Sequence, residues 1–328
     1  MVISDFRPLK ARSAAALEHA SFDHRKLILL HTGISSAVLL ILAVINLILQ
    51  NQIAGTVGLA GLGTRAVLET IQTILQVAVS LAMPFWEFGY FFMVLRLERG
   101  ENASFSTLLG GFRCFAPMLR LMILNGLIYT VIAFTVLYPS MMIFIASPLS
   151  NAYMNALEPL VISGAAVDPT ALMQDSAMVE ALYAGLKPML AVFGVLFLLI
   201  AAPVFYRLRL TQFALADHPE EGARKAIGKS FRLMKRNCLK LLKLDISFWW
   251  FYALQAVMAL ICYGDLIAPK LGISLPFSAD TAYLIFYCAN LAGQLVLFWY
   301  SKNYVMATYA AVYDSLDPPT QDITLNPL

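Results

Sequence analysis

Seven ionisable side chains lie within or at the edges of long apolar runs in this sequence, where burying a charge is costly. They are His31, Glu87, Arg120, Arg207, Arg209, Asp245 and Lys302. A charged side chain in the bilayer core costs several kcal/mol, so each such residue is a candidate for a functional site. Six of them form a predicted polar vestibule open to the cytosol: Glu87, Arg120, Arg207, Arg209, Asp245 and Lys302.

Two interpretations of this set remain open. In one, the long stems of the arginines and of Lys302 carry their charges out to the head groups. In the other, Glu87 and Asp245 face these cations across a wet vestibule. Glu87 is the best evidence for the vestibule, because a short acid that deep in an apolar run reaches the head groups poorly. We predict that Glu87 pairs with Arg120 or with Lys302.

The sequence predicts no metal, cofactor or catalytic site. Glu18-His19 and Asp23-His24 are interpreted as polar residues leading into the first apolar run. The four cysteines form no CxxC pair and are interpreted as apolar fillers. No HExxH motif or nucleophile elbow occurs, so an enzyme is the least favoured class of function.

Composition identifies the medium in which these residues lie. The chain has 328 residues, of which 60% are hydrophobic and 13% charged, against about 25% charged in ordinary soluble domains. Six apolar runs are long enough to cross about 30 Å of hydrocarbon as helices, and the first is expected to be retained as a span. They lie at about 27–49, 70–95, 117–147, 188–206, 244–264 and 281–301. The third holds Pro139, where a kink or an early end is expected.

The distribution of Lys and Arg gives an orientation. The N-terminal segment, the 96–120 and 207–243 connections and the C-terminal end together hold twenty of the 23 basic residues, and the alternate connections hold Arg65, Lys187 and Lys270. The positive-inside rule therefore predicts a multi-pass protein of the cell membrane with both termini in the cytosol.

Each cytosolic basic segment resembles a short amphipathic helix, at 8–22, 103–115 and 219–237. In the last, Asp217 and Glu220 have the spacing of a capping box. Anionic lipid head groups are the expected partners of this helix, and no nucleic acid is expected. The candidate contacts are Lys229, Arg232, Lys235 and Arg236.

The fold predicted is therefore all-α: a transmembrane bundle of six spans in three hairpins, each hairpin preceded by an interfacial helix. Residues 1–316 form one membrane domain, and 317–328 form a disordered tail. An offset of 119 residues aligns Pro84 with Pro203 and Glu101 with Glu220, so a tandem repeat is one possible origin.

One family shares the pattern around the basic segment. Its elements here are Tyr206, Leu215-Ala216-Asp217, Pro219, Met234-Lys235 and Leu244-Asp245-Ile246-Ser247-Phe248. The chain resembles the bacterial integral membrane proteins grouped as domain of unknown function 975, most clearly over 203–250 and loosely over 80–315. Two positions depart from the family pattern. The family usually has proline-glycine in the fourth span, where this chain has Pro203-Val204, and proline-tyrosine after the last span, where it has Asn303-Tyr304. The resemblance implies a polytopic membrane protein and no activity.

Two functions fit these features. The first is a membrane-embedded interaction or assembly protein whose basic helices bind anionic lipid or an acidic partner. The second is a transporter or lipid-handling protein that uses the vestibule. A wet cavity reaching Glu87 and Asp245 would favour transport, and a dry interior with an exposed basic surface would favour interaction.

Overall fold

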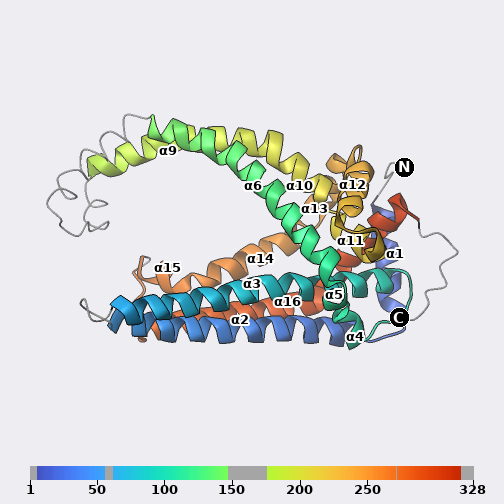
Figure 1. Cartoon of the computed structure of the whole chain (residues 1–328), viewed down its shortest axis with the longest axis horizontal. Coiled ribbons are helices and arrows are strands. Elements are labelled where there is room, and N and C mark those ends of the chain that lie inside the picture. Colours follow the sequence, from blue (N-terminus) through green and yellow to red (C-terminus); the bar gives the residue numbers. More distant parts are fainter. Residues whose placement is uncertain (1–5, 56–61, 147–175, 271, 319–328) are drawn as a thin grey trace. The chain divides into compact units, whose positions relative to one another are not determined.

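The computed structural model describes residues 6–55, 62–146, 176–270 and 272–318, and every regular element in these ranges is a helix (Figure 1). Five helices are long and apolar enough to cross a membrane: His24–Ile53, Gly63–Glu98, Phe115–Ile145, Leu186–Asp217 and Ala279–Leu316. The all-α prediction is confirmed, and these five helices indicate a membrane protein. The predicted tail from 319 onward and most of the 148–187 connection lie outside the described residues.

The predicted fifth span, 244–264, is not one straight helix. Helix α13 (Cys238–Ser247) and helix α14 (Trp249–Cys262) meet at a bend of 67°, and only as a bent pair do they count as a sixth candidate span. The bend lies at Phe248, whose backbone leaves the helical conformation with φ −105° and ψ 20°. The third predicted span does not end at Pro139, because α6 (Phe115–Ile145) continues through it.

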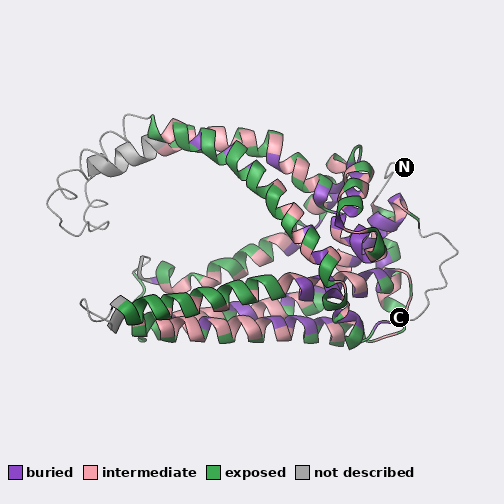
Figure 2. Cartoon of the chain, viewed as in Figure 1, coloured by how far each residue is buried: buried purple, intermediate pink, exposed green. Residues whose placement is uncertain are grey.

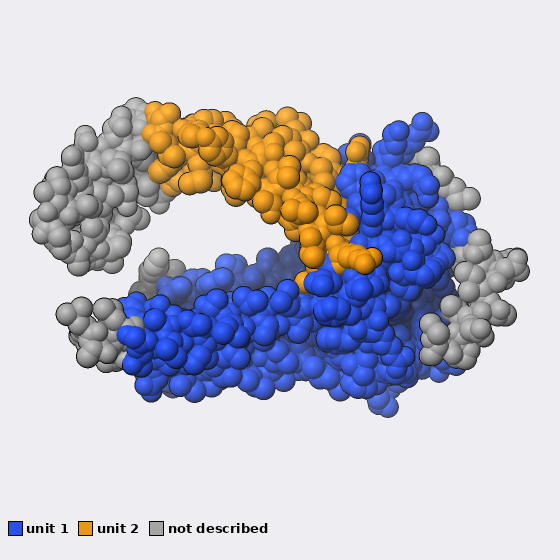
Figure 3. All heavy atoms as spheres, in the orientation of Figure 1, with its two compact units in different colours: residues 1–119, 210–328 blue, residues 120–209 orange. Residues whose placement is uncertain are grey.

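The chain divides into two compact units (Figure 3), which are described separately. Unit 2, residues 120–209, contains most of α6 together with α9 (Ser176–Leu196), the π-helix η2 (Phe197–Ala201) and α10 (Ala202–Leu208). Ile132 and Val136 of α6 pack with Ala201 of η2 in its core. The wide π turn lies just before Pro203, where the missing backbone N–H interrupts the helical ladder.

Unit 1, residues 1–119 and 210–328, is built around α16 (Ala279–Leu316). This helix packs against α2 (His24–Gly55), α3 (Leu62–Glu98) and α14. Buried residues of unit 1 gather where the last turns of α16 meet the short helices, whereas the first half of α3 is largely exposed and α2 is mostly half-buried (Figure 2). An apolar exposed surface is expected where lipid is the solvent.

The short helices of unit 1 lie near the last turns of α16. They are α1 (Arg7–Glu18), α4 (Phe105–Leu108), α5 (Gly110–Arg113), α11 (Thr211–Asp217), η3 (Pro219–Glu221) and α12 (Ala223–Met234). The predicted capping box at Asp217 is wrong, because Asp217 ends α11 and Gly222 is the N-cap of α12. Gly222 has φ 79°, which favours glycine.

Candidate functional site

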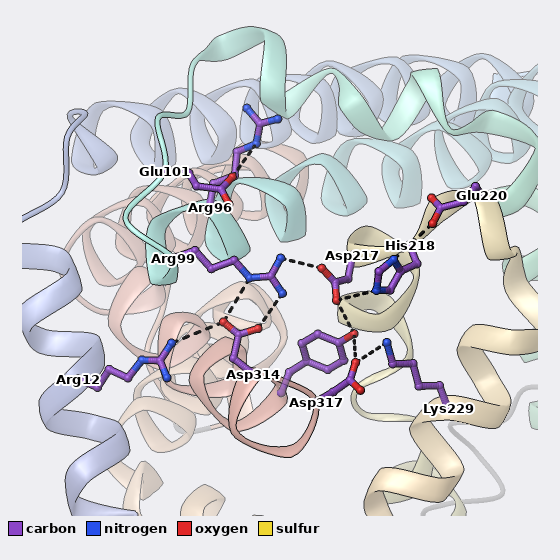
Figure 4. Close-up of polar contacts among 11 residues, drawn as sticks. Arg12, Arg96, Arg99, Glu101, Asp217, His218, Glu220, Lys229, Asp314 and Asp317 are labelled. Carbon is purple, nitrogen blue, oxygen red and sulfur yellow. Dashed lines mark hydrogen bonds and ion pairs between the residues drawn. The ribbon is translucent and has the colours of Figure 1, made fainter. Parts of the chain in front are cut away.

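Arg99, just beyond the end of α3, binds two carboxylates from other parts of unit 1 (Figure 4). One terminal nitrogen donates to Asp217 Oδ1 at 2.7 Å, and the other donates to Asp314 Oδ1 at 2.8 Å. Its Nε also donates to Asp314 Oδ2 at 3.3 Å, which makes the contact with Asp314 bidentate. The guanidinium thereby joins the ends of α3, α11 and α16.

These ions are largely removed from solvent. The side chain of Arg99 is 18% exposed, and those of Asp217 and Asp314 are 8% and 1% exposed. Burial by itself would lower the pKa of Arg99, but the hydrogen bonds and charges of Asp314 and Asp217 outweigh it and raise that pKa above its usual value. Arg99 is therefore a permanent cation at the centre of the cluster.

Arg12 extends the cluster to α1. Its Nε lies 2.6 Å from Glu98 Oε1, and a terminal nitrogen lies 3.6 Å from Asp314 Oδ2. The side chain of Glu98 is fully buried, so Arg12 provides the opposite charge that a buried carboxylate requires. Two arginines, from α1 and from the end of α3, thus contact the carboxylate of Asp314 (Figure 4).

Tyr313 and Lys229 connect the cluster to α12. The Tyr313 hydroxyl lies 2.8 Å from Asp217 Oδ2 and 3.1 Å from Asp317 Oδ2, so its single proton is shared between the two carboxylates. Lys229 forms an ion pair with Asp317, and its ammonium lies 5.5 Å from the centre of the Tyr313 ring. His218 lies close to Asp217, with Nε2 3.4 Å from Oδ2. Helix α12 is therefore attached to α16 through Lys229.

We call this set the charged network: Arg12, Glu98, Arg99, Asp217, His218, Lys229, Tyr313, Asp314 and Asp317. Most of its charges pair with one another, which suits a junction between helices, although the buried Glu98 carboxylate has only its ion pair with Arg12 and no hydrogen bond within the described residues. Among the described residues, no group of three or more His, Cys, Asp or Glu side chains is arranged to hold a metal ion. The network therefore positions α12 and the end of α16.

Helix α12 presents its basic residues on the side away from the protein. Ala223, Ala226, Ser230 and Met234 are its buried positions. At about 100° per residue, the side opposite this stripe carries five exposed cations from α12 and the two residues after it. They are Arg224, Lys225, Arg232, Lys235 and Arg236. Three of these are predicted lipid contacts, whereas the fourth predicted contact, Lys229, is directed to Asp317.

An exposed apolar stripe follows this basic surface directly. Leu239, Leu242 and Ile246 of α13 are 75%, 38% and 61% exposed, and their spacing places them on one face of the helix. Trp249, the first residue of α14, is 68% exposed. Cations beside an apolar face are typical of a helix at a membrane interface.

A second polar centre lies between α2, α3 and α16. Lys302 Nζ is 3.6 Å from Glu87 Oε2, so Glu87 has one of the two partners predicted for it. His31 Nε2 lies 4.0 Å from Glu87 Oε1, and the imidazole is fully buried and stacked 5.0 Å from the Trp86 ring. Neither ring nitrogen of His31 has a hydrogen-bond partner within the described part of the chain. A buried polar atom without a hydrogen-bond partner is unusual and marks a candidate site.

The other predicted vestibule residues lie in two different parts of the chain. Asp245 of α13 accepts from the hydroxyl of Tyr309, and Tyr252 and Tyr309 hydroxyls lie 2.7 Å apart. Arg120, Arg207 and Arg209 belong to unit 2. The vestibule as a whole therefore stays a prediction, with the Glu87–Lys302 pair as the part that the structure contains.

Sequence reasoning missed Arg99 and Asp314. It treated Arg99 only as a topology marker, and it ended the last span at 301, although α16 continues to Leu316. One signal was present: the stretch 303–316 contains a single ionisable acid, Asp314, among apolar residues and three tyrosines. A lone carboxylate in such a helix indicates a buried partner.

Comparison with known proteins gives a family and nothing closer. The sequence model of the family described as "Protein of unknown function (DUF975)" matches residues 24–316. No curated protein and no solved structure matches the chain. The match includes the basic surface and the Glu87–Lys302 pair, and all of the charged network except Arg12 and Asp317.

Proposed function

This chain belongs to the family of proteins of unknown function DUF975, and we propose that it is a membrane-embedded interaction protein whose basic surface binds anionic phospholipid head groups. That surface consists of Arg224, Lys225, Arg232, Lys235 and Arg236. The observation that carries the proposal is its position beside the exposed apolar stripe of α13. A soluble acidic protein would complement the cations, but it would leave Leu239 and Ile246 in water.

The charged network supports this role by fixing the basic helix. Lys229 points inward to Asp317, and Asp217 attaches the preceding helix to Arg99. Because α12 is anchored on its inner side, the backbone that carries the outward cations is already ordered before binding, and only their side chains have to be ordered. This preorganisation favours binding of phosphate groups to the cations.

A charge-matched pair of triple variants tests the proposal. R232Q/K235Q/R236Q removes three cations from the basic surface, and R65Q/K187Q/K270Q removes three from the alternate connections. Each protein is purified in mild detergent, and binding of added phosphatidylglycerol and phosphatidylcholine is measured by native mass spectrometry. At about 1 kcal/mol per cation near an anionic surface, removing three cations predicts a loss of about a hundredfold in phosphatidylglycerol affinity for the first variant only.

The two variants also separate a lipid role from a protein role. Equal phosphatidylglycerol binding by R232Q/K235Q/R236Q and wild type would refute lipid recognition by this surface. Loss of a co-purifying acidic protein from that variant, with lipid binding unchanged, would assign the surface to a protein partner instead. Raised salt should weaken the wild-type interaction, because exposed charges are screened.

The proposal includes a topology. With the bent α13–α14 pair as the fifth crossing, the chain has six spans in three hairpins, and α1, α4–α5 and α12 lie on the cytosolic side of the cell membrane with both termini. Cysteine labelling from each side tests it. A cysteine at Lys225 should react from the cytosol only, and one at Arg65 from the opposite side only.

A second function, transport or lipid handling through a cytosol-facing vestibule, rests on the Glu87–Lys302 pair and on His31. Three apolar helices contribute these groups, and the His31 imidazole is buried without a hydrogen bond in the described residues. Glu87→Gln removes the charge while keeping the shape of the side chain. If this variant keeps wild-type stability and the wild-type cellular phenotype, the vestibule loses its main support.

A further inference from the structure

A polar cavity and an apolar groove follow one face of α16 in unit 1, and both are lined by Tyr300. The cavity, of about 140 Å³, is also lined by Glu18 at the end of α1, Arg25 at the start of α2, and Trp299 and Tyr304. The groove, of about 560 Å³, lies between α14 and α16. Its other lining residues are Ser301 and the apolar or small residues Leu254, Met258, Ala292, Gly293, Val296 and Leu297.

The cavity has the chemistry of a zwitterion site. Glu18 provides an anion and Arg25 a cation, and neither is in an ion pair within the described part of the chain. The aromatic rings of Trp299, Tyr300 and Tyr304 add faces that attract an organic ammonium group. A cavity of about 150 Å³ accommodates benzene, so about 140 Å³ accommodates an ammonium group with its neighbouring carbons.

One wall of the cavity is held rigidly. The Asn303 amide nitrogen donates to the backbone oxygen of His24 at 2.9 Å, and its oxygen accepts from the Tyr90 hydroxyl at 2.8 Å. Asn303 itself is buried. Both ends of its amide are thus occupied, which fixes α2 against α16 beside the cavity. Glu18 and Arg25 also line this cavity, and both are exposed.

The groove begins where the cavity ends. Gly293, Val296, Tyr300 and Tyr304 recur at intervals of three and four residues, so they lie on one face of α16. From Gly293 to Tyr304 this face runs about 16 Å along the helix axis, at 1.5 Å per residue. The apolar part belongs to the middle of the helix, and the polar part lies at the level where α2 begins. This order matches a lipid with its head group at the interface and its chain in the membrane core.

From this arrangement we infer that unit 1 binds one zwitterionic phospholipid of the phosphatidylethanolamine type. Its ammonium group occupies the aromatic cavity beside Glu18, its phosphate contacts Arg25, and one acyl chain lies in the groove between α14 and α16. The site shares no residue with the basic surface, and it combines an anion with a cation where the basic surface has cations alone. The shared residue, Tyr300, lies where the head group meets the chain.

Lipid binding by matched variants tests the inference. Native mass spectrometry measures binding of phosphatidylethanolamine and phosphatidylglycerol to wild type, Glu18→Gln and Val296→Trp. Glu18→Gln should lower phosphatidylethanolamine affinity by about tenfold, as expected for one charge-assisted contact, and leave phosphatidylglycerol affinity unchanged. Val296→Trp fills the groove and should lower phosphatidylethanolamine affinity to a similar degree.

Two controls keep the test specific. Glu69→Gln neutralises an exposed acid elsewhere, and Val77→Trp enlarges a valine on α3 that is 52% exposed, close to the 57% of Val296. Neither should alter binding of phosphatidylethanolamine. Gel filtration shows whether each variant is folded, and Glu18, an exposed residue, provides a readout that does not depend on the groove variant.

Contrary outcomes are equally clear. Wild-type phosphatidylethanolamine affinity in Glu18→Gln would overturn the inference. Competition by free phosphoethanolamine, together with full binding by Val296→Trp, would assign the cavity to a soluble ligand and overturn the lipid assignment. Loss of phosphatidylglycerol binding in R232Q/K235Q/R236Q with phosphatidylethanolamine binding retained would support two separate sites, so failure of either proposal is recognisable by itself.

Discussion

Replacing Arg99 by methionine is the most direct test of the charged network. The change keeps an apolar stem of similar length and removes the cation between Asp217 and Asp314. Those side chains are 8% and 1% exposed, so water cannot replace the lost partner. Removing one partner of a buried pair costs about 3–5 kcal/mol.

The surrounding contacts reduce this cost. Arg12 stays 3.6 Å from Asp314, and the Tyr313 hydroxyl still donates to Asp217 at 2.8 Å. We therefore expect the lower end of the range, about 3 kcal/mol of lost unfolding free energy. Arg99→Lys should lose less, because one ammonium can pair with one of the two carboxylates but lacks the bidentate fork.

Equilibrium unfolding by SDS titration in mixed micelles measures these free energies. Arg65→Met is the control, because Arg65 and Glu69 form an exposed pair, 54% and 52% exposed, worth at most about 1 kcal/mol. A double-mutant cycle that combines Arg99→Met with Asp314→Asn isolates the interaction of this pair. The double variant should lose less unfolding free energy than the two single variants lose together. An unfolding free energy for Arg99→Met within about 0.5 kcal/mol of wild type would refute the reasoning.

Three further outcomes follow from other contacts in the structure. Gly111→Ala should lower the unfolding free energy by about 2 kcal/mol or more, because the added Cβ would lie 1.9 Å from a backbone oxygen of α3. Gly126→Ala is the control and should not destabilise, because among the described residues no atom outside its own helix lies near the added Cβ. Tyr313→Phe should cost about 1–2 kcal/mol by SDS titration, since its hydroxyl proton is shared between two carboxylates; no loss would mean that those contacts are dispensable. Lys229→Gln should destabilise more than Lys225→Gln, because Lys229 pairs with Asp317 and Lys225 is exposed, and equal losses would contradict that assignment.

The sequence by itself determined the helical, apolar character of this protein and where most of the helices lie. Runs of 19 or more apolar residues have few folded alternatives in lipid, because every backbone polar group must be paired within the segment. The same reasoning placed Glu87 among residues that need a partner. It failed at Phe248, where a bend of 67° divides an apolar run that reads as uninterrupted.

Only the tertiary structure decided which charges meet. About a hundred residues separate Arg99 from Asp217, and about as many separate Asp217 from Asp314. No local spacing therefore indicates that the three share one cluster. The extension of α16 to Leu316 brings Tyr313 and Asp314 to the ends of α3 and α11. Partner choice among buried ions depends on how helices pack in three dimensions, whereas apolar periodicity and length act locally and can be read from the sequence.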